Sequence, residues 1–224
     1  MSATGRGILA LDTATHTIVV AVGTLAGDVL AYEAFEGRYR HSQELLPAVV
    51  RVLERAGLRL GDLDGIVVGT GPGAFTGLRV GIATAKTLAH ELGIPIVGVP
   101  TSDALLAATE GATEVWLPSG PRDRVVVRAG AAPTVLRGDP QPREGSVDGV
   151  AAVDLADRAP EGALALGRRA VEGLPAALHR LGVERLSAGD VDDPQQLVPA
   201  YAVAPRGAPD GAAEGGVAWS RDPR

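Results

Sequence analysis

The chain contains no cysteine and only four histidines, so several kinds of functional site are excluded at the outset. Without cysteine there can be no disulfide, no thiol nucleophile and no thiolate metal site. The four histidines are never one helical turn apart, and no Gly-x-Ser-x-Gly motif is present. We therefore predict no catalytic residue and no metal ligand. The histidines are His16, His41, His90 and His179.

The chain also lacks a run of positive charge. Its 21 basic residues face 27 acidic ones, which gives a formal net charge of −6. A protein that binds nucleic acid by itself usually carries a basic patch, so we expect any nucleic-acid role to depend on a partner. No run reaches the roughly 18 apolar residues of a membrane-spanning helix, and the start has no secretory apolar segment. We expect a soluble, cytoplasmic protein with no membrane contact.

The most informative stretch runs from Gly69 to Lys86. The apolar residues 66–68 predict a buried strand that leads into it. Glycines around Pro72 then predict a tight turn, and Thr76 is a candidate cap for the helix that follows. The stretch matches neither the phosphate-loop pattern, which ends in Gly-Lys-Ser/Thr, nor the spacing of the dinucleotide fingerprint. We read it as a strand, a glycine turn and a helix.

This helix combines an apolar stripe with a ridge of small residues. The ridge consists of Gly77, Gly81 and Ala85, spaced four apart, and such spacing lets another backbone approach closely. Glycine inside a soluble helix costs about 1 kcal/mol relative to alanine, which indicates a need for close packing. Two interpretations remain open: the helix lies tight on its own sheet, or it packs against a helix of a partner.

The residues before the glycine stretch predict three strands and a helix. The apolar segments 8–13, 17–22 and 29–35 predict an antiparallel meander, and the loop after the first strand is rich in hydroxyls. A helix should follow from His41 to about residue 56, with a delayed start or a kink at Pro47. After the central helix we expect a strand at 94–99 and a helix capped by Thr101 or Ser102. This order favours an α/β layer sandwich.

The second half carries a weaker signal. Short strands are expected near residues 115–117, 124–128, 134–137 and 149–153. Segment 164–181 contains Gly173 and Pro175, and we expect one broken helix there or a helix plus a turn. From Pro205 onward the composition predicts a disordered tail.

Together these stretches resemble the TsaB (YeaZ) family, the non-catalytic subunit in bacterial synthesis of threonylcarbamoyladenosine on tRNA. The resemblance covers residues 8–106 well. It rests on three segments, with a fainter match at Leu197 to Tyr201. The three segments are Ile8 to Thr15, Arg40 to Pro47 and Gly71 to Ala89.

The resemblance implies an α/β, two-lobed actin-like ATPase (ribonuclease H-like) fold with a reduced C-terminal lobe. Residues 1–104 would form an N-terminal, partner-binding lobe and residues 105–204 the reduced lobe, followed by a flexible tail at 205–224. The catalytic relative in the complex, TsaD, shares the glycine stretch but continues with Asn-His-x-x-x-His, whose histidines bind a metal. Here those places hold Pro100, Thr101 and Leu105, so the chain resembles the non-catalytic partner.

The resemblance also implies partners. The chain would be a scaffold and activator rather than an enzyme, in the complex that transfers threonylcarbamoyl to the adenosine adjacent to the anticodon. It would bind the catalytic subunit TsaD and the ATPase TsaE, contact tRNA only through the complex, and form a homodimer in isolation. The predicted interface comprises Leu45, Leu46, Val49, Leu53, Gly77, Leu78, Gly81, Ile82 and Ala85.

In actin-like folds the first hairpin faces phosphate, and here it holds Asp12, Thr13 and Thr15. Because no second phosphate loop is evident, we expect no cofactor and weak or absent nucleotide binding. The alternative hypotheses are a stand-alone ATP-dependent kinase or transferase of the actin-like superfamily, a glycoprotease-type peptidase, and an adaptor for an unrelated partner. The peptidase ranks lowest, because the sequence offers it neither a nucleophile nor a metal site.

Overall fold

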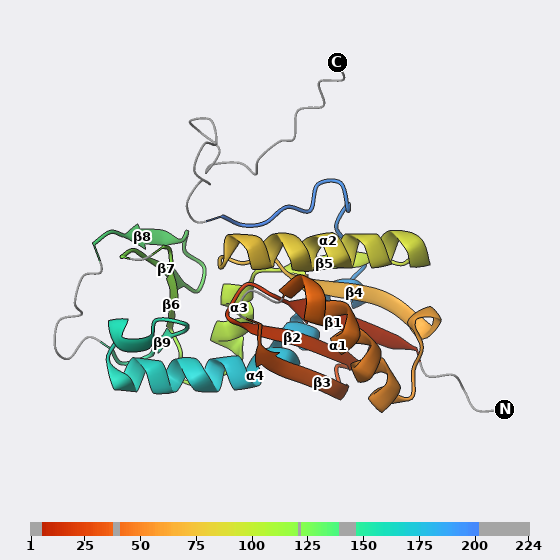
Figure 1. The fold of residues 1–224 in the computed structure, drawn as a ribbon, viewed down its shortest axis with the longest axis horizontal. Helices are drawn as coiled ribbons and strands as arrows, with labels where there is room; N and C mark the ends of the chain where they lie inside the picture. The colour runs from red at the N-terminus through yellow and green to blue at the C-terminus, as the bar shows by residue number, and fades with distance from the viewer. Residues whose placement is uncertain (1–5, 38–40, 121, 139–146, 202–224) are drawn as a thin grey trace, which may run out of the picture.

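A computed structural model describes residues 6–37, 41–120, 122–138 and 147–201 (Figure 1). The predicted tail at 205–224 lies outside these residues. These described residues form two sheets, four α-helices and two short 3-10 helices, Leu60–Asp62 and Ala156–Arg158. Among the described residues, no helix combines the length and the apolar character needed to cross a bilayer.

The first sheet has five strands in the order β3-β2-β1-β4-β5. The first three strands pair antiparallel, which confirms the predicted meander, and β4 and β5 extend the sheet in parallel to β1. The strands are β1 (Gly7–Asp12), β2 (Thr17–Gly23), β3 (Val29–Glu36), β4 (Leu63–Gly69) and β5 (Ile96–Val99).

Helices cover both faces of this sheet. On one face, α1 (His41–Ala56) and α2 (Phe75–Leu92) enclose a core with alternate residues of β1, β2 and β4. On the other face, α3 (Thr101–Ala107) and α4 (Glu161–Ser187) enclose a second core. Alternation along the strands sends successive side chains to the two cores, as in any sheet buried on both faces.

The second sheet has four short strands in the order β8-β7-β6-β9. The four strands predicted from the weaker half of the sequence are thus confirmed. They are β6 (Glu114–Pro118), β7 (Arg124–Arg128), β8 (Thr134–Leu136) and β9 (Val150–Ala152).

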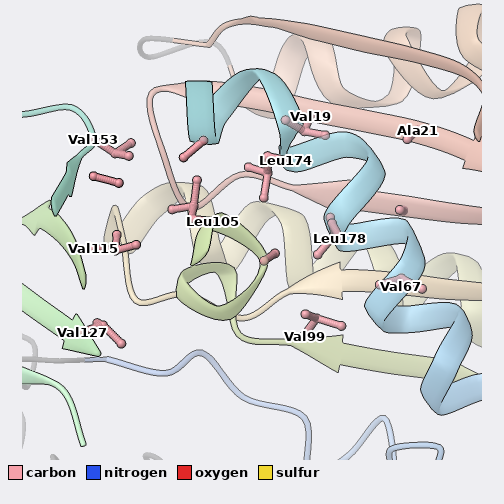
Figure 2. Close-up of a cluster of buried hydrophobic side chains, with 14 of the residues drawn as sticks. Val19, Ala21, Val67, Val99, Leu105, Val115, Val127, Val153, Leu174 and Leu178 are labelled. Atoms are coloured by element: carbon pink, nitrogen blue, oxygen red, sulfur yellow. The ribbon is translucent and has the colours of Figure 1, made fainter. Parts of the chain in front are cut away.

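One apolar core joins the two sheets. Figure 2 shows Val115, Val127 and Val153 of the second sheet region close to Leu105 of α3 and Leu174 of α4. In Figure 1, α4 extends from beneath the first sheet to the strands of the second. The predicted lobe boundary between residues 104 and 105 falls within α3, and the division into lobes at that point stays a prediction.

Four local expectations were wrong. Helix α4 is continuous through Gly173 and Pro175, and at Gly173 it lies so close to the Ala108 carbonyl that a Cβ would not fit. Helix α1 begins at His41, so the delayed start is wrong, while the kink at Pro47 stays a prediction. The capping predictions for α2 and α3 also failed. Ala74 and Pro100 are the N-cap residues, and neither Thr76 nor Thr101 or Ser102 caps its helix.

Candidate functional site

Three loops meet where the parallel strands of the first sheet end. β1 ends at Asp12, β4 leads into the glycine turn, and β5 leads into α3 at Thr101. In open α/β sheets, ligands bind at this carboxyl edge of the strands. The polar side chains gathered here are therefore the first candidates for a functional site.

Asp12 is the centre of this cluster and is fully buried. Its Oδ1 accepts a 2.8 Å hydrogen bond from the Ala14 amide, and its Oδ2 accepts a 2.6 Å hydrogen bond from the Thr101 hydroxyl. The Thr101 oxygen in turn accepts a hydrogen bond from the Gly71 amide at 3.0 Å. Asp12 thus ties the first hairpin, the glycine turn and α3 together.

Burial raises the pKa of Asp12 from 3.8 to about 6. Hydrogen bonds from Thr101 and Ala14 lower this pKa, while the nearby Asp154 charge adds to the rise. Gly69 makes room for the carboxylate, because a Cβ at that position would overlap Asp12. The site therefore keeps a carboxyl group that is costly to ionise inside a closely packed polar cluster.

The two threonines of the predicted phosphate loop are engaged within their own chain. The Thr13 hydroxyl donates to the Gly77 carbonyl at 2.7 Å, and the Thr15 hydroxyl donates to the Thr17 carbonyl at 2.9 Å. Asp12, Thr13 and Thr15 are each no more than 1% exposed. A phosphate group could reach these side chains only if the loop opened, and nucleotide binding stays a prediction.

The small ridge of α2 accommodates this loop. A Cβ at Gly81 would overlap the Thr13 hydroxyl, and Gly77 supplies the carbonyl that Thr13 binds. Within the described chain the ridge is thus used for close packing by the chain itself, which was one of the two interpretations.

Asp154 links the loop to the second sheet region. It follows β9 with a positive φ of 58°, a conformation that costs energy for a residue other than glycine. Its Oδ2 accepts a 2.7 Å hydrogen bond from the His16 amide, and its Oδ1 lies 3.5 Å from His16 Nδ1. Sequence reasoning missed Asp154, because nothing local connects it with a residue 138 positions away.

The predicted interface residues lie mostly inside the molecule. Leu45, Val49 and Leu53 of α1 are at most 3% exposed. Leu78, Ile82 and Ala85 of α2 are at most 4% exposed, and Gly77 and Gly81 are buried as well. A side chain that packs in its own core cannot also enter a partner, so this part of the predicted interface needs correction. Leu46 is the exception, at 50% exposure.

Other side chains of α1 and α2 face outward and were not identified from the sequence. Val50 is 48% exposed one turn after Leu46, and Phe75 is 40% exposed at the start of α2. The Phe75 ring stacks on Tyr201 with centroids 5.1 Å apart, and the Arg79 guanidinium carbon lies 4.7 Å from the Phe75 centroid. The spacing of Leu46 and Val50 was the available signal, but the neighbouring buried stripe obscured it.

By resemblance, three positions of this chain correspond to the metal-binding Asn-His-x-x-x-His segment of TsaD. In this chain those three residues have structural roles. Pro100 is the N-cap of α3, Thr101 bonds Asp12, and Leu105 is fully buried in the core. Across the described ranges, no three acidic or histidine side chains gather closely enough to hold a metal ion.

The chain is similar to several known proteins that are named TsaD, TsaB or YeaZ. The model of the TsaD family, described as tRNA N6-adenosine threonylcarbamoyltransferase, matches residues 36–137. The tRNA threonylcarbamoyladenosine biosynthesis protein TsaB of Escherichia coli is 39% identical over 113 residues, 50% of this chain and 46% of that protein. The structure of YeaZ from Pseudomonas aeruginosa, at 26% identity, superposes with a TM-score of 0.63 over 88% of this chain and 99% of that one. The chain is similar to the TsaB (YeaZ) proteins over about half of its sequence and to the YeaZ structure in its fold.

An uncharacterised protein of Mycobacterium tuberculosis (strain H37Rv) is 42% identical over 109 residues, 48% of this chain and 52% of that protein. The chain spans no more than about half the length of the first curated relatives it matches. The likeness to the YeaZ structure extends over both sheets. The predicted α/β fold is therefore confirmed as one with two sheets that matches the YeaZ structures.

Proposed function

We propose that this chain is a non-catalytic scaffold and activator subunit in bacterial synthesis of threonylcarbamoyladenosine on tRNA. Its direct partner would be a TsaD-type catalytic subunit. The observation that carries the proposal is the role of Thr101. Its hydroxyl is buried between Asp12 and the Gly71 amide, at a position where a metal-binding histidine would be expected in the catalytic subunit.

A threonylcarbamoyl transfer needs an oriented acyl donor and stabilisation of developing charge, work for which a metal ion is suited. Here the carboxylate and hydroxyls at the corresponding edge of the sheet hold loops together instead. We therefore assign this chain a role in binding its partner through its surface, rather than in the transfer reaction itself. The relatives named for tRNA threonylcarbamoyladenosine biosynthesis support the assignment to this pathway.

The partner-binding face would be formed by the outward sides of α1 and α2. These helices run parallel, because each leads from the carboxyl end of a strand back to the start of the next. Leu46 lies in the second turn of α1 and Val50 one turn later, and Phe75 and Arg79 lie in the first turns of α2. Exposed aromatic, aliphatic and arginine side chains of this kind are common at the centres of protein interfaces.

Further parts of the proposal concern the rest of the complex. A TsaE-type ATPase would join the pair, and tRNA would be contacted through the complex, in keeping with the net charge of −6. In isolation the same apolar face would pair with a second copy of the chain. Nucleotide binding would be weak or absent, because the hairpin side chains are already engaged.

The direct test mixes the purified chain with the TsaD-type subunit of the same organism. We expect one heterodimer peak in size-exclusion chromatography and tRNA modification only when both proteins are present with the remaining components. Two separate peaks at micromolar concentrations would overturn the proposal. Mg-ATP turnover by the isolated chain would favour the stand-alone kinase or transferase instead.

A pair of variants locates the interface. Leu46→Glu places a charge on the proposed face and should raise the dissociation constant about tenfold or more, since a carboxylate is costly to bury unpaired. Leu30→Glu is the matched control, because Leu30 is also 50% exposed but lies on β3. Equal affinity of the two variants would place the interface elsewhere.

A further inference from the structure

After α4 the chain turns back and crosses the first sheet region as an extended segment, residues 190–201, which we call the C-terminal strap. In Figure 1 the blue trace runs beside α2 toward the start of that helix. The strap contains no helix, and only a single bridge residue pairs with a strand. Its contacts are nevertheless specific at both ends.

The beginning of the strap is fixed to the free edge of β5. The Asp192 amide donates to the Ile96 carbonyl at 2.9 Å, and Asp192 Oδ2 accepts from the Gly98 amide at 2.7 Å. Arg185, near the end of α4, donates to the Gly98 carbonyl at 2.6 Å and to Asp192 Oδ2 at 3.2 Å. These hydrogen bonds give partners to backbone groups at the edge of β5, and they set the direction in which the strap leaves α4.

The middle of the strap is held by α2 and by β5. Leu197 is 8% exposed, and it packs so close to Gly98 that a Cβ there would lie 2.5 Å from its Cδ1. The Leu197 carbonyl accepts a 2.9 Å hydrogen bond from Lys86 Nζ. The strap thus follows α2 along the outer side of the molecule.

The end of the strap meets the glycine turn and the first turn of α2. The Ala200 amide donates to the Thr70 carbonyl at 2.8 Å. Tyr201 then stacks on Phe75 at an interplanar angle of 28°, and Arg79 lies against the same Phe75 ring. Three side chains from two distant parts of the sequence form one aromatic and cationic cluster at the surface.

We propose that Tyr201 is a positioning residue of the partner-binding face, which it reaches by way of the strap. The inference rests on the proposed function, because it assigns this cluster to the surface that contacts the TsaD-type subunit. Phe75 is 40% exposed, and an unsupported exposed ring would sample several rotamers. Stacking on Tyr201 holds one orientation, so less conformational entropy is lost when a partner binds.

The cluster also indicates the chemistry of the partner surface. A half-exposed phenyl ring with a guanidinium beside it fits an apolar depression bordered by a carboxylate. Because α1 and α2 are parallel, Phe75 and Arg79 in the first turns of α2 lie toward the same end of the helix pair as Leu46 in the second turn of α1. The proposed occupant is therefore a single TsaD-type surface that covers both helices.

The test compares Tyr201→Ala, Tyr201→Phe and a control in the full chain. Tyr201→Ala should raise the dissociation constant for the TsaD-type subunit about tenfold, while Tyr201→Phe, which keeps the ring, should stay within about threefold. Tyr32→Ala is the matched control, because Tyr32 is a 54% exposed tyrosine on the edge strand β3. It should bind like the wild type.

Hydrogen exchange supplies a readout that does not depend on the partner. In the isolated Tyr201→Ala variant, amides of residues 70–79 should exchange several times faster, with the β1 amides unchanged. Equal affinity of Tyr201→Ala and wild type, or unchanged exchange, would overturn this inference alone. Failure of the wild type to bind the TsaD-type subunit would overturn the proposed function and this inference together.

Discussion

The hydroxyl of Thr101 donates a 2.6 Å hydrogen bond to the carboxylate of Asp12, across 89 positions of sequence. Both side chains are fully buried. The bond joins the end of the first strand to the start of α3, and the Gly71 amide completes it from the glycine turn. One polar contact therefore fixes the relative positions of three loops.

Removing this hydroxyl should destabilise the fold. Thr101→Val preserves the shape but leaves Asp12 Oδ2 and the Gly71 amide without their partner, which should lower the free energy of unfolding by about 1–3 kcal/mol. Denaturant titration at pH 7 measures the change. Thr101→Ser keeps the hydroxyl and should retain most of the stability. If both variants are equally stable, the hydrogen bond contributes little.

The buried carboxyl group should produce a distinctive pH dependence. The pKa of Asp12 is about 6 in the folded chain and 3.8 without burial. Between these values the folded state binds more protons, so this group's contribution to stability is fullest below about pH 4 and is lost as the pH rises past 6. The difference corresponds to about 3 kcal/mol.

Asp12→Asn removes this titration. The free energy of unfolding of the wild type, minus that of Asp12→Asn, should therefore fall between pH 4 and pH 7. Taking the difference at each pH removes the contribution of every group that titrates equally in both proteins. A difference that stays constant over this range would contradict the raised pKa.

The titration of His179 should change the stability of the fold in the opposite sense to that of Asp12. Burial lowers the pKa of His179, opposed by the Gly23 and Gly27 backbone and by the charge of Asp28. The unfolded state then binds more protons below its pKa of 6.5, so stability falls as the pH drops below that value.

The variant His179→Leu should keep stability at pH 7 within about 1.5 kcal/mol and lose this acid sensitivity. Thermal melting at pH 5, 6 and 7 provides the measurement. His90→Leu is the control, since His90 is exposed on α2, and it should leave the acid sensitivity as in the wild type. Retained acid sensitivity in His179→Leu would assign the effect to other groups.

A single methyl group on the small ridge should disturb the first hairpin. At Gly81 a Cβ would overlap the Thr13 hydroxyl, so Gly81→Ala should force the loop to move and cost about 1–3 kcal/mol. Ala83→Ser, which adds an atom on the exposed side of the same helix, should change stability by less than about 0.5 kcal/mol. Normal stability of Gly81→Ala would show that the loop yields easily.

The strands and the glycine turn could be predicted because their signals are local. The apolar runs of β1, β2 and β4 and the glycines around Pro72 determine their own conformation. α4 was harder, since Gly173 and Pro175 are helix breakers by local rules. Glycine is required at position 173 by its close approach to Ala108, a tertiary contact that the sequence does not reveal.

The orientation of α1 and α2 was misjudged for a related reason. A stripe such as Leu45 and Val49 indicates only that something apolar covers it, and that cover was the chain's own sheet. The exposed residues Leu46 and Phe75 follow no strong periodicity. The hydrogen bond between His16 and Asp154 could not be predicted from the sequence either, because it depends on how two distant segments meet.

The continuity of α4 has a consequence for experiments that divide the chain. Its 27 residues, about 40 Å of helix, pack against strands from both halves. A fragment that ends before residue 161 would leave valines and leucines of either sheet facing water, and such a fragment should aggregate rather than fold. Co-expressed pieces would need to reassemble around this helix before either half acquired its native shape.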